Sequence, residues 1–432
     1  MTKSEKKTIG AAVCGNALEY FDLMLYAHFM FILTPLFFPH SDPHVSRLMG
    51  VSAFVLGFII RPVGSIFFGH LGDRIGRRVA LALSIGLMAI PTFIIGVLPT
   101  YEVIGITAPI ILLICRILQN FCVSGESTGS AIFLVEHART NKECFMSSLL
   151  NTSLLIGSIM GTILGYLSTK FLPEWGWRVP FVIGSLFGWI GFYIRYKIGE
   201  TPAFSGTKAK EKSSIPLLKI IKNQYRNFFC VIGICAGIMV AFYTTYIYMS
   251  DVLKDRLNFS PHRIMAHNTI MMAVCIIFLP LMGIIADKIG IKKVMQTSAL
   301  ALAFFAYPLF YLIMSTNLLS SVIIAQLILG LCWSGLAGPT CALTTSLFPV
   351  VGRYSGISVA WSIGAIIFVG SAPFYYIYLS RWLNNPAAPA FYLTFCALIC
   401  WFGVKFSQPL TISKNQESYE IHTHKLLVAK AS

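Results

Sequence analysis

Apolar runs of about 20 residues recur along almost the whole of this chain, separated by short polar segments. A helix rises ~1.5 Å per residue, so a run of that length crosses a hydrocarbon core ~30 Å thick. The pattern predicts twelve membrane-spanning helices. They cover roughly residues 9–37, 47–71, 79–98, 107–136, 144–170, 177–198, 227–253, 263–286, 293–314, 318–348, 354–380 and 387–406.

Composition agrees with this pattern, because 56% of the residues are hydrophobic and only 12% are charged. Those values exclude a soluble globular protein of the ordinary kind. The first run follows three lysines and resembles a secretory signal. It is too long for one and contains Glu19 and Asp22. We therefore expect it to remain in the protein as the first span.

The basic residues are distributed unevenly along the predicted topology. With both termini on one side of the membrane, that side holds 24 of the 33 Lys and Arg residues, and the opposite loops hold seven. Only Arg61 and Arg116 remain, and both lie inside predicted spans. The positive-inside rule places both termini in the cytoplasm of a multi-pass plasma membrane protein, a bacterial inner-membrane protein by our expectation. The net charge of +16 therefore reflects the membrane topology, and its basic residues would be attracted to anionic lipid. We expect no nucleic-acid partner.

The segment Arg61–Arg78, RPVGSIFFGHLGDRIGRR, begins on an apolar helix and ends in a cluster of charge. Gly64 and Gly69 would let a neighbouring helix approach closely. Asp73 lies where the helix leaves the bilayer. Its carboxylate can accept a hydrogen bond from an arginine or lie at the N-terminus of another helix. The alternative is an ordinary positive-inside loop.

The same pattern returns in Met282–Lys293, MGIIADKIGIKK. Asp287 follows Asp73 by 214 residues, about half of the chain's 432. This repeat predicts a duplicated membrane protein with two pseudo-symmetric six-helix bundles, at residues 1–198 and 227–407. Between them we expect a cytoplasmic linker, 199–226, with a short amphipathic helix at 215–225, and after them a cytoplasmic tail, 408–432. The loop from Arg195 to Arg226 carries eight basic and two acidic residues.

Polar residues gather in the first predicted bundle. On the first span Asn16, Glu19, Asp22 and Tyr26 share one helical face, and an ionised side chain at membrane depth costs ~3 kcal/mol. On the fourth span Arg116, Gln119 and Glu126 also share one face. We expect Glu19, Asp22 and Arg116 near the midplane, with Arg61 and Glu126 deeper toward the cytoplasm. The candidate proton-coupling residues are Glu19, Asp22, Arg116 and Glu126, and the candidate substrate contacts of this bundle are Asn16, Tyr26, Arg61 and Gln119.

The second predicted bundle offers aromatic residues in place of charge. Tyr243, Tyr246, Trp333 and Trp361 are candidate substrate contacts, although lipid-facing or packing roles are common for such residues in membrane helices. The eleven cysteines show no metal-binding spacing, so we expect no metal and no cofactor. The intramembrane histidines, His28 and His267, lack a nucleophile or metal pattern, so we expect no enzyme. A sensor or scaffold role is disfavoured, since no soluble input or output domain is evident.

The pattern G-x-L-G-D-R-x-G-R-R at 69–78 resembles the signature between helices 2 and 3 of the major facilitator superfamily. Further stretches resemble its metabolite:proton symporter family: GNALEYFDLMLY at 15–26, FIIRPVGSIFFGHLGDRIGRR at 58–78, IGITAPIILLICRILQNFCVSGESTGSAIFLVEHA at 104–138, WGWRVPF at 175–181, ETPAF at 200–204 and FPVVGRYSG at 348–356. Members resembling this chain carry proline, betaine, 2-oxoglutarate, shikimate or citrate. The resemblance implies an all-α major facilitator fold and proton-coupled uptake by alternating access. Two departures are Gln326 on the tenth span and the lack of the long C-terminal coiled coil that some osmosensing members have.

These observations predict proton-coupled uptake of a small zwitterion of the proline or betaine kind. Three core carboxylates against two arginines leave one carboxylate in excess, Glu19 or Asp22, to bind the proton beside Arg116. A di- or tricarboxylate would need more cations than the core supplies. Alternatives are symport of an organic acid and a proton-independent facilitator. We expect a monomer whose partners are substrate, protons and the lipid bilayer, with a conformational latch formed by Gly69, Asp73, Arg74, Gly76, Arg77, Arg78, Asp287 and Lys288.

Overall fold

The computed structural model describes residues 3–39, 43–138, 141–197, 200, 222–316, 318–350 and 352–410. All regular structure in these ranges is helical. Side-chain placement at His28, most of the predicted amphipathic helix at 215–225 and most of the tail at 408–432 lie outside what is described.

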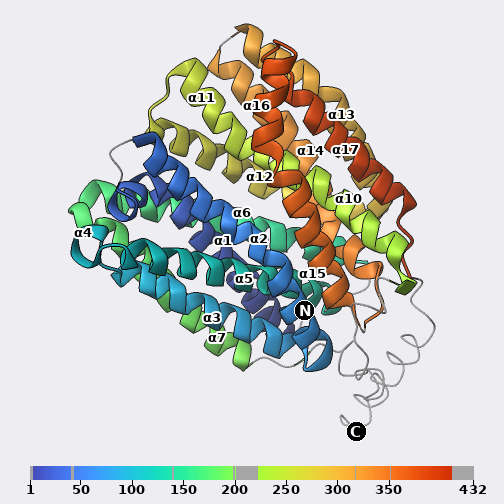
Figure 1. Ribbon diagram of the computed structural model, residues 1–432. Coiled ribbons are helices and arrows are strands. Elements are labelled where there is room, and N and C mark those ends of the chain that lie inside the picture. The colour runs from blue at the N-terminus through green and yellow to red at the C-terminus, as the bar shows by residue number, and fades with distance from the viewer. Residues whose placement is uncertain are drawn as a thin grey trace.

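The first half contains six long helices and two short ones (Figure 1). The short ones, α4 (Tyr101–Ile104) and the 3₁₀-helix η1 (Glu174–Trp177), lie in connections between the long ones. The long helices are α1 (Lys3–Phe37), α2 (Pro43–Arg74), α3 (Arg77–Val97), α5 (Thr107–Glu136), α6 (Glu143–Phe171) and α7 (Arg178–Tyr196).

The second half begins with α10 (Tyr225–Phe242), the π-helix η3 (Tyr243–Tyr248) and α11 (Met249–Leu257), which form one continuous span. A second continuous span joins α15 (Arg353–Gly364), the π-helix η4 (Ala365–Val369) and α16 (Ala372–Trp382). Between and after them lie α12 (Pro261–Ile289), α13 (Ile291–Thr316), α14 (Leu319–Ser346) and α17 (Pro389–Phe406).

The helices match the apolar pattern closely. Each predicted span corresponds to one helix or to two helices joined by a π-helix, and in the described part of the chain ten are long and apolar enough to cross a membrane. The π-helices were not expected, because a turn with i→i+5 hydrogen bonds has the same apolar composition as the α-helix around it.

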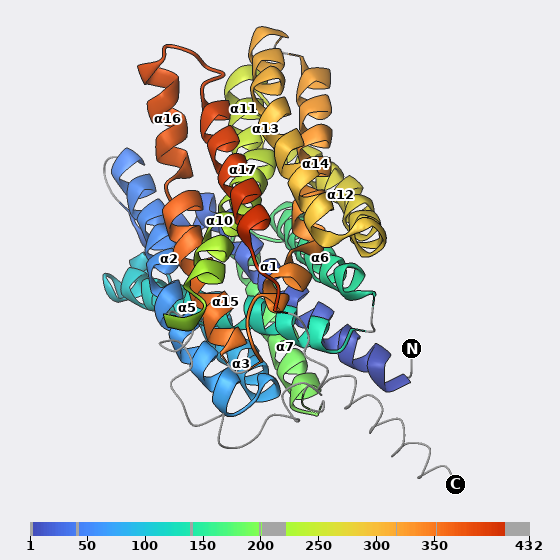
Figure 2. The same cartoon turned by 90° about the vertical axis from the view of Figure 1, so that its right-hand side faces the viewer.

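The two halves form separate groups of helices that meet along a few of them (Figures 1 and 2). α2 packs along α15, and α6 packs along α12 and α14.

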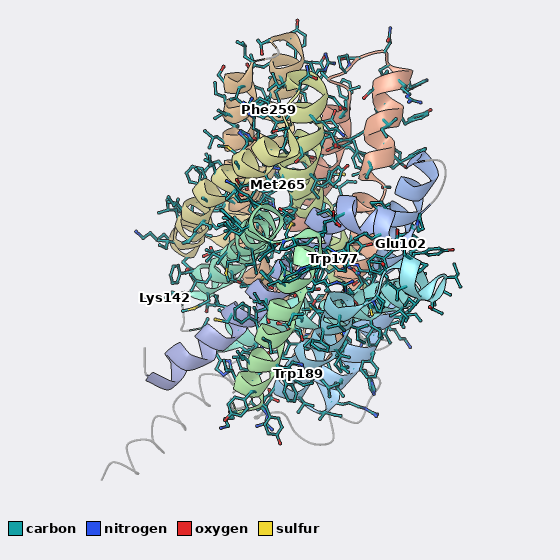
Figure 3. All side chains as sticks on the ribbon, turned by 90° about the vertical axis from the view of Figure 1, so that its left-hand side faces the viewer. Glu102, Lys142, Trp177, Trp189, Phe259 and Met265 are labelled. Carbon is teal, nitrogen blue, oxygen red and sulfur yellow. The ribbon has the colours of Figure 1, made fainter. Side chains whose placement is uncertain are left out.

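We call one end of the molecule the basic face. At this end α2 ends at Arg74, α5 ends at Glu136 and α15 begins at Arg353. Phe259, in the loop between α11 and α12, lies at the opposite end of the molecule from Trp189 on α7 (Figure 3). The described polar contacts between the halves run from the basic face inward as far as Ser65 and Ser362, whose hydroxyl oxygens are 2.6 Å apart.

Candidate substrate and coupling site

Asp22 is the centre of a buried hydrogen-bond network in the first half. Its side chain, 5% exposed, accepts a hydrogen bond from Thr92 Oγ1 at 2.9 Å and one from Gln119 Nε2 at 2.7 Å. Gln119 in turn accepts a hydrogen bond from Arg116 at 2.8 Å. The network therefore links Arg116 to Asp22 through Gln119, and both carboxylate oxygens of Asp22 have donors.

Arg116 also contacts the first helix directly. Its guanidinium carbon lies 3.8 Å from the ring centroid of Tyr26, at cation–π distance. The four predicted residues Asp22, Tyr26, Arg116 and Gln119 are thus brought together between α1 and α5. Thr92 was missed by the sequence interpretation. It and Ser84 are the polar side chains within the otherwise apolar sequence 79–97, and that was the available signal.

Glu126 forms an ion pair with Arg195, and both side chains are buried. Ser84 Oγ and Ser130 Oγ each donate to the carboxylate, at 3.0 and 2.9 Å. This corrects two sequence-based expectations. Arg195, counted above as a loop residue, is 4% exposed near the end of α7. The core therefore contains three arginines facing three carboxylates, and the inferred excess of one carboxylate is wrong.

Glu19 differs from the other two acids of the core. Its side chain is 2% exposed, and within the described residues its Oε2 atom has no hydrogen-bond partner. It interacts electrostatically with Arg61 and with Glu126. Arg61 is partly exposed and donates from Nε to Asn120 Oδ1 at 3.1 Å. Arg61 lies within electrostatic range of Cys235 in the second half, so Glu19 and Arg61 lie near the boundary between the halves.

The remaining predicted contact of the first half, Asn16, has a packing partner. Its amide nitrogen donates to Ser153 Oγ at 2.9 Å and to the Leu150 carbonyl at 3.0 Å. These bonds fix α1 against α6. Gly157 lies on the same seam, where an added Cβ would come 1.9 Å from the Ala17 carbonyl oxygen.

The predicted aromatic contacts of the second half fall into separate groups. The ring of Tyr246 lies 6.0 Å from that of Trp333, edge to face, and Phe242 packs against both. Trp333 is 1% exposed, and its Nε1 atom has no hydrogen-bond partner among the described residues. Tyr243 instead packs 5.7 Å from Tyr376 on α16. Trp361 is half-buried against the core of the second half.

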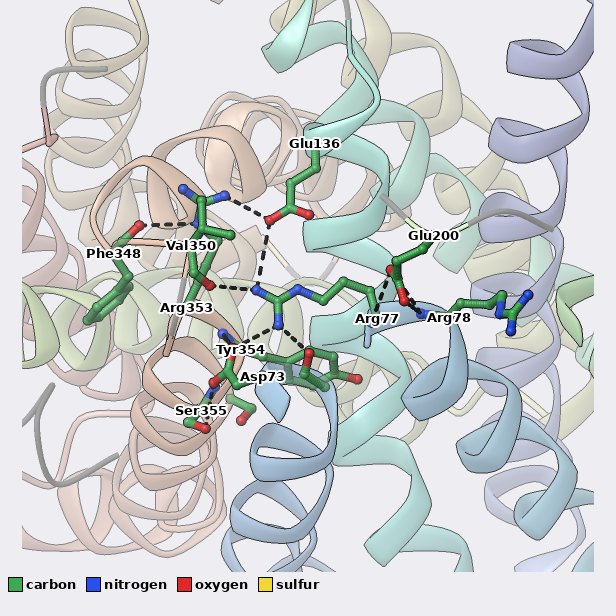
Figure 4. Close-up of polar contacts among 12 residues, drawn as sticks. Asp73, Arg77, Arg78, Glu136, Glu200, Phe348, Val350, Arg353, Tyr354 and Ser355 are labelled. Carbon is green, nitrogen blue, oxygen red and sulfur yellow. Dashed lines mark hydrogen bonds and ion pairs between the residues drawn. The ribbon is translucent and has the colours of Figure 1, made fainter. Parts of the chain in front are cut away.

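At the basic face, Asp73 caps the N-terminus of α15 across the boundary between the halves (Figure 4). Its carboxylate accepts from the backbone N–H groups of Tyr354 and Ser355 at 3.2 and 2.9 Å, and from Ser355 Oγ at 2.7 Å. Arg77 pairs with the same carboxylate at 2.7 Å. Both arrangements considered for Asp73, an arginine partner and a helix N-terminus, occur together.

Further polar contacts join the two halves beside Asp73 and Arg77 (Figure 4). Arg77 donates to the Val350 carbonyl at 2.7 Å, and Glu136 accepts from Arg353 at 2.8 Å. Glu200, in the ETPAF stretch, accepts from the backbone N–H groups of Arg77 and Arg78 and so caps α3.

The second copy of the motif makes the equivalent contact with the roles of the halves exchanged. Asp287 accepts from the backbone N–H groups of Cys144 and Phe145, at 2.9 and 3.0 Å, at the N-terminus of α6. The motif glycines explain the close approach. A Cβ at Gly69 would lie 2.7 Å from Ser355 Cα, and one at Gly283 would lie 2.8 Å from the Cys144 carbonyl oxygen.

The turns that follow Asp73 and Asp287 each contain a glycine with the same sign of φ. Gly76 and Gly290 both have positive φ, 138° and 105°, which a residue with a side chain rarely adopts. Of the other predicted latch residues, Arg78 is partly buried, whereas Arg74 and Lys288 are exposed. The structure therefore brings Asp73 and Arg77 of the motif into the contact between the halves and leaves these two cations at the surface.

Residues 7–226 match the family of sugar and other transporters, and residues 238–429 match the major facilitator superfamily. The chain belongs to the major facilitator superfamily. As a member it is a multi-pass membrane transporter of small solutes and not an enzyme.

Among its relatives in this superfamily is the proline/betaine transporter of Escherichia coli (strain K12), which is 34% identical over 413 residues, 91% of this chain and 81% of that protein. A glycine betaine/proline/ectoine/pipecolic acid transporter of Dickeya dadantii (strain 3937) is 33% identical over 410 residues, with the same coverage of 91% and 81%. A putative proline/betaine transporter of Staphylococcus aureus (strain COL) is 32% identical over 421 residues, 96% of this chain and 90% of that protein.

Solved structures of the superfamily share the fold. The proton:xylose symporter XylE, bound to 6-bromo-6-deoxy-D-glucose, matches with a TM-score of 0.73 at 18% identity and covers 93% of this chain and 95% of its own. The human organic anion transporter MFSD10 matches with a TM-score of 0.72 at 12% identity, with 93% and 100% covered. The predicted all-α major facilitator fold is confirmed.

Proposed function

We propose that this chain takes up a small zwitterion of the proline or betaine class, driven by a proton gradient, through alternating access of its two halves. The observation that carries the coupling is Glu19, a buried carboxylate with an unpartnered oxygen near the boundary between the halves. A buried carboxylate with one oxygen that lacks a donor is stabilised when that oxygen binds a proton. Asp22 is the second candidate, and it already has donors on both oxygens.

Charge balance in the core supports a zwitterion as the substrate. Three arginines face three carboxylates, so no surplus of cations is available for a di- or tricarboxylate. A zwitterion adds no net charge. Arg61 is partly exposed and can bind a carboxylate, while aromatic rings such as those of Tyr246 and Trp361 can contact an ammonium group at ~0.5–2 kcal/mol each. The names of the relatives are consistent with this class.

The basic face is the cytoplasmic side in this proposal, because the positive-inside rule assigns it there. The polar contacts from Asp73, Glu136 and Asp287 would then close the molecule toward the cytoplasm. Breaking them would open the substrate path inward. The halves themselves are residues 1–198 and 227–407, joined by the linker at 199–226, and the protein functions as a monomer.

Uptake by purified protein in liposomes tests the proposal. Labelled L-proline or glycine betaine should accumulate when the outside is acidic, and unlabelled zwitterions should compete while 2-oxoglutarate and citrate do not. Competition in the reverse order would establish an organic-acid symporter. Equilibration without accumulation would establish a facilitator and remove the proton from the mechanism.

Two variants separate the candidate proton sites. Glu19→Gln should abolish accumulation driven by a pH gradient and retain counterflow of substrate at no imposed gradient, because the amide mimics the protonated acid. Asp22→Asn keeps a similar shape but places an amide nitrogen against the donors Thr92 and Gln119, so it should slow both modes of transport. If Glu19→Gln accumulates substrate normally and Asp22→Asn alone loses coupling, the proton binds at Asp22.

A further inference from the structure

The π-helix η3 is held in place by side-chain amides from two neighbouring helices. Gln326 of α14 donates from Nε2 to the Thr245 carbonyl at 2.8 Å. Asn268 of α12 donates from Nδ2 to the Tyr246 carbonyl at 3.2 Å. Ser250 Oγ donates to the same carbonyl at 2.8 Å and accepts from Asn268 at 2.7 Å. Two consecutive backbone carbonyls of the π-helix thus have side-chain donors.

The orientation of Gln326 is fixed by His267. The Gln326 amide nitrogen faces a carbonyl, which only accepts, so its oxygen faces His267 and the imidazole Nε2 donates to it. His267 and Gln326 are both buried. His267, Asn268, Ser250 and Gln326 therefore form one connected polar cluster, which we call the amide clamp.

Such a cluster has a physical reason inside a membrane. A π-helix changes the hydrogen-bond partners of the carbonyls in its turn, and within hydrocarbon no water replaces a lost donor. An unsatisfied carbonyl costs several kcal/mol there. The side-chain donors of α12 and α14 satisfy these carbonyls only while η3 keeps its present register, so they remove the cost for that register alone.

The register of η3 determines where its aromatic side chains lie. If the π turn relaxed to α-helical geometry, the residues on one side of it would rotate by ~100° relative to the other side. Tyr246 would then leave Trp333, which it contacts edge to face at 6.0 Å, and Tyr243 would leave Tyr376.

We propose that the amide clamp, with Gln326 as its central member, is a positioning device that fixes the register of η3 and thereby sets substrate affinity. The inference rests on the proposed function insofar as Tyr243 and Tyr246 contact the substrate. Gln326 does not itself touch the substrate in this proposal. It acts through the Thr245 carbonyl.

The principal test is Gln326→Met, which keeps the length of the side chain and removes the hydrogen bonds of its amide group. Transport of labelled L-proline and glycine betaine should show a KM raised about tenfold or more with Vmax within about twofold of the unsubstituted protein. Asn268→Leu should act in the same direction. Ser346→Ala is the matched control, because the Ser346 hydroxyl at the end of the same helix donates to its own helix at the Leu343 carbonyl. It should leave KM unchanged.

A second readout does not depend on the substrate. Amide hydrogen exchange over residues 243–250 of the full chain should accelerate in Gln326→Met and not in Ser346→Ala, whereas exchange in α13 should stay constant. Unchanged exchange at 243–250 would overturn the clamp. A fall in Vmax with constant KM would overturn its role in affinity. If the unsubstituted protein transports neither probe, the proposed function fails, and the exchange result alone decides whether the clamp exists.

Discussion

The two copies of the motif make the same contact in different surroundings. Asp73 and Asp287 each place a carboxylate at the N-terminus of a helix from the other half, where unsatisfied N–H groups and the helix dipole favour negative charge. Asp73 is fully buried and also pairs with Arg77. Asp287 is only partly buried, and the position equivalent to Arg77 is Ile291.

This difference shows how a duplicated structure can specialise. Among the described residues, the second contact is a helix cap without an ion pair. The first is a cap embedded in a buried network with Glu136 and Arg353. Buried ion pairs tolerate the loss of one partner poorly, because the other charge remains without compensation. We therefore expect the first copy to control the closed state more strongly than the second.

Arg77→Ala should have the largest effect. It leaves Asp73 and Glu136 without their shared cation, at a cost of ~3–5 kcal/mol to the closed state. Transport should fall by about two orders of magnitude. Spin labels at the exposed positions Arg74 and Lys288, in a background without other cysteines, should report a longer distance between the halves. An unchanged distance would contradict the role of Arg77.

Asp73→Asn should come next. The substitution keeps the shape and removes charge-assisted hydrogen bonds worth ~1.5–3 kcal/mol, which the contact has only while the halves are closed. We expect transport to fall about tenfold or more with normal insertion, measured as uptake per amount of folded protein. Normal transport in a well-expressed variant would mean that the motif acts only as a topology signal.

Asp287→Asn should have a smaller effect of a few-fold. Two backbone N–H groups lose a charged acceptor, but no buried cation is left unpaired. The same uptake assay and label pair measure it. An effect as large as that of Asp73→Asn would show that the helix cap, and not the ion pair, dominates both contacts.

Arg74→Ala and Lys288→Ala should change transport least, by less than about twofold. Both side chains are exposed, and interactions of exposed charges contribute ~0–1 kcal/mol. They are the matched controls for Arg77→Ala, since each also removes one cation from the basic face. A severe loss in either would show that surface charge itself controls closure.

The sequence predicted the spans well because an apolar run of bilayer length has few alternatives. It also predicted that Asp73 lies at a helix terminus, since the motif ends where its helix leaves the membrane. Its partner could not be predicted, because Ser355 lies 282 residues away. Arg195 was misassigned because a cation near the end of a span resembles a loop residue until the burial beside Glu126 is seen.

Polar residues in apolar helices were harder to interpret. Thr92 and Gln326 are isolated in their sequences, and an isolated hydroxyl or amide gives no periodicity to follow. Their roles depend on what lies opposite, Asp22 for one and the Thr245 carbonyl for the other. The choice between Glu19 and Asp22 likewise depends on the count of donors at each carboxylate, which only the packed structure supplies.

The two π-helices also affect how this chain would respond to deletion mutagenesis. A π turn holds one residue more than an α turn, so removing one residue from Tyr243–Tyr248 or from Ala365–Val369 would restore a continuous α-helix while both flanking segments keep the faces they now present. Removing one residue elsewhere in the same spans would rotate one segment against the other by ~100°. In a scan of single-codon deletions across these two spans, inserted and folded protein should therefore be recovered mainly at these two short windows.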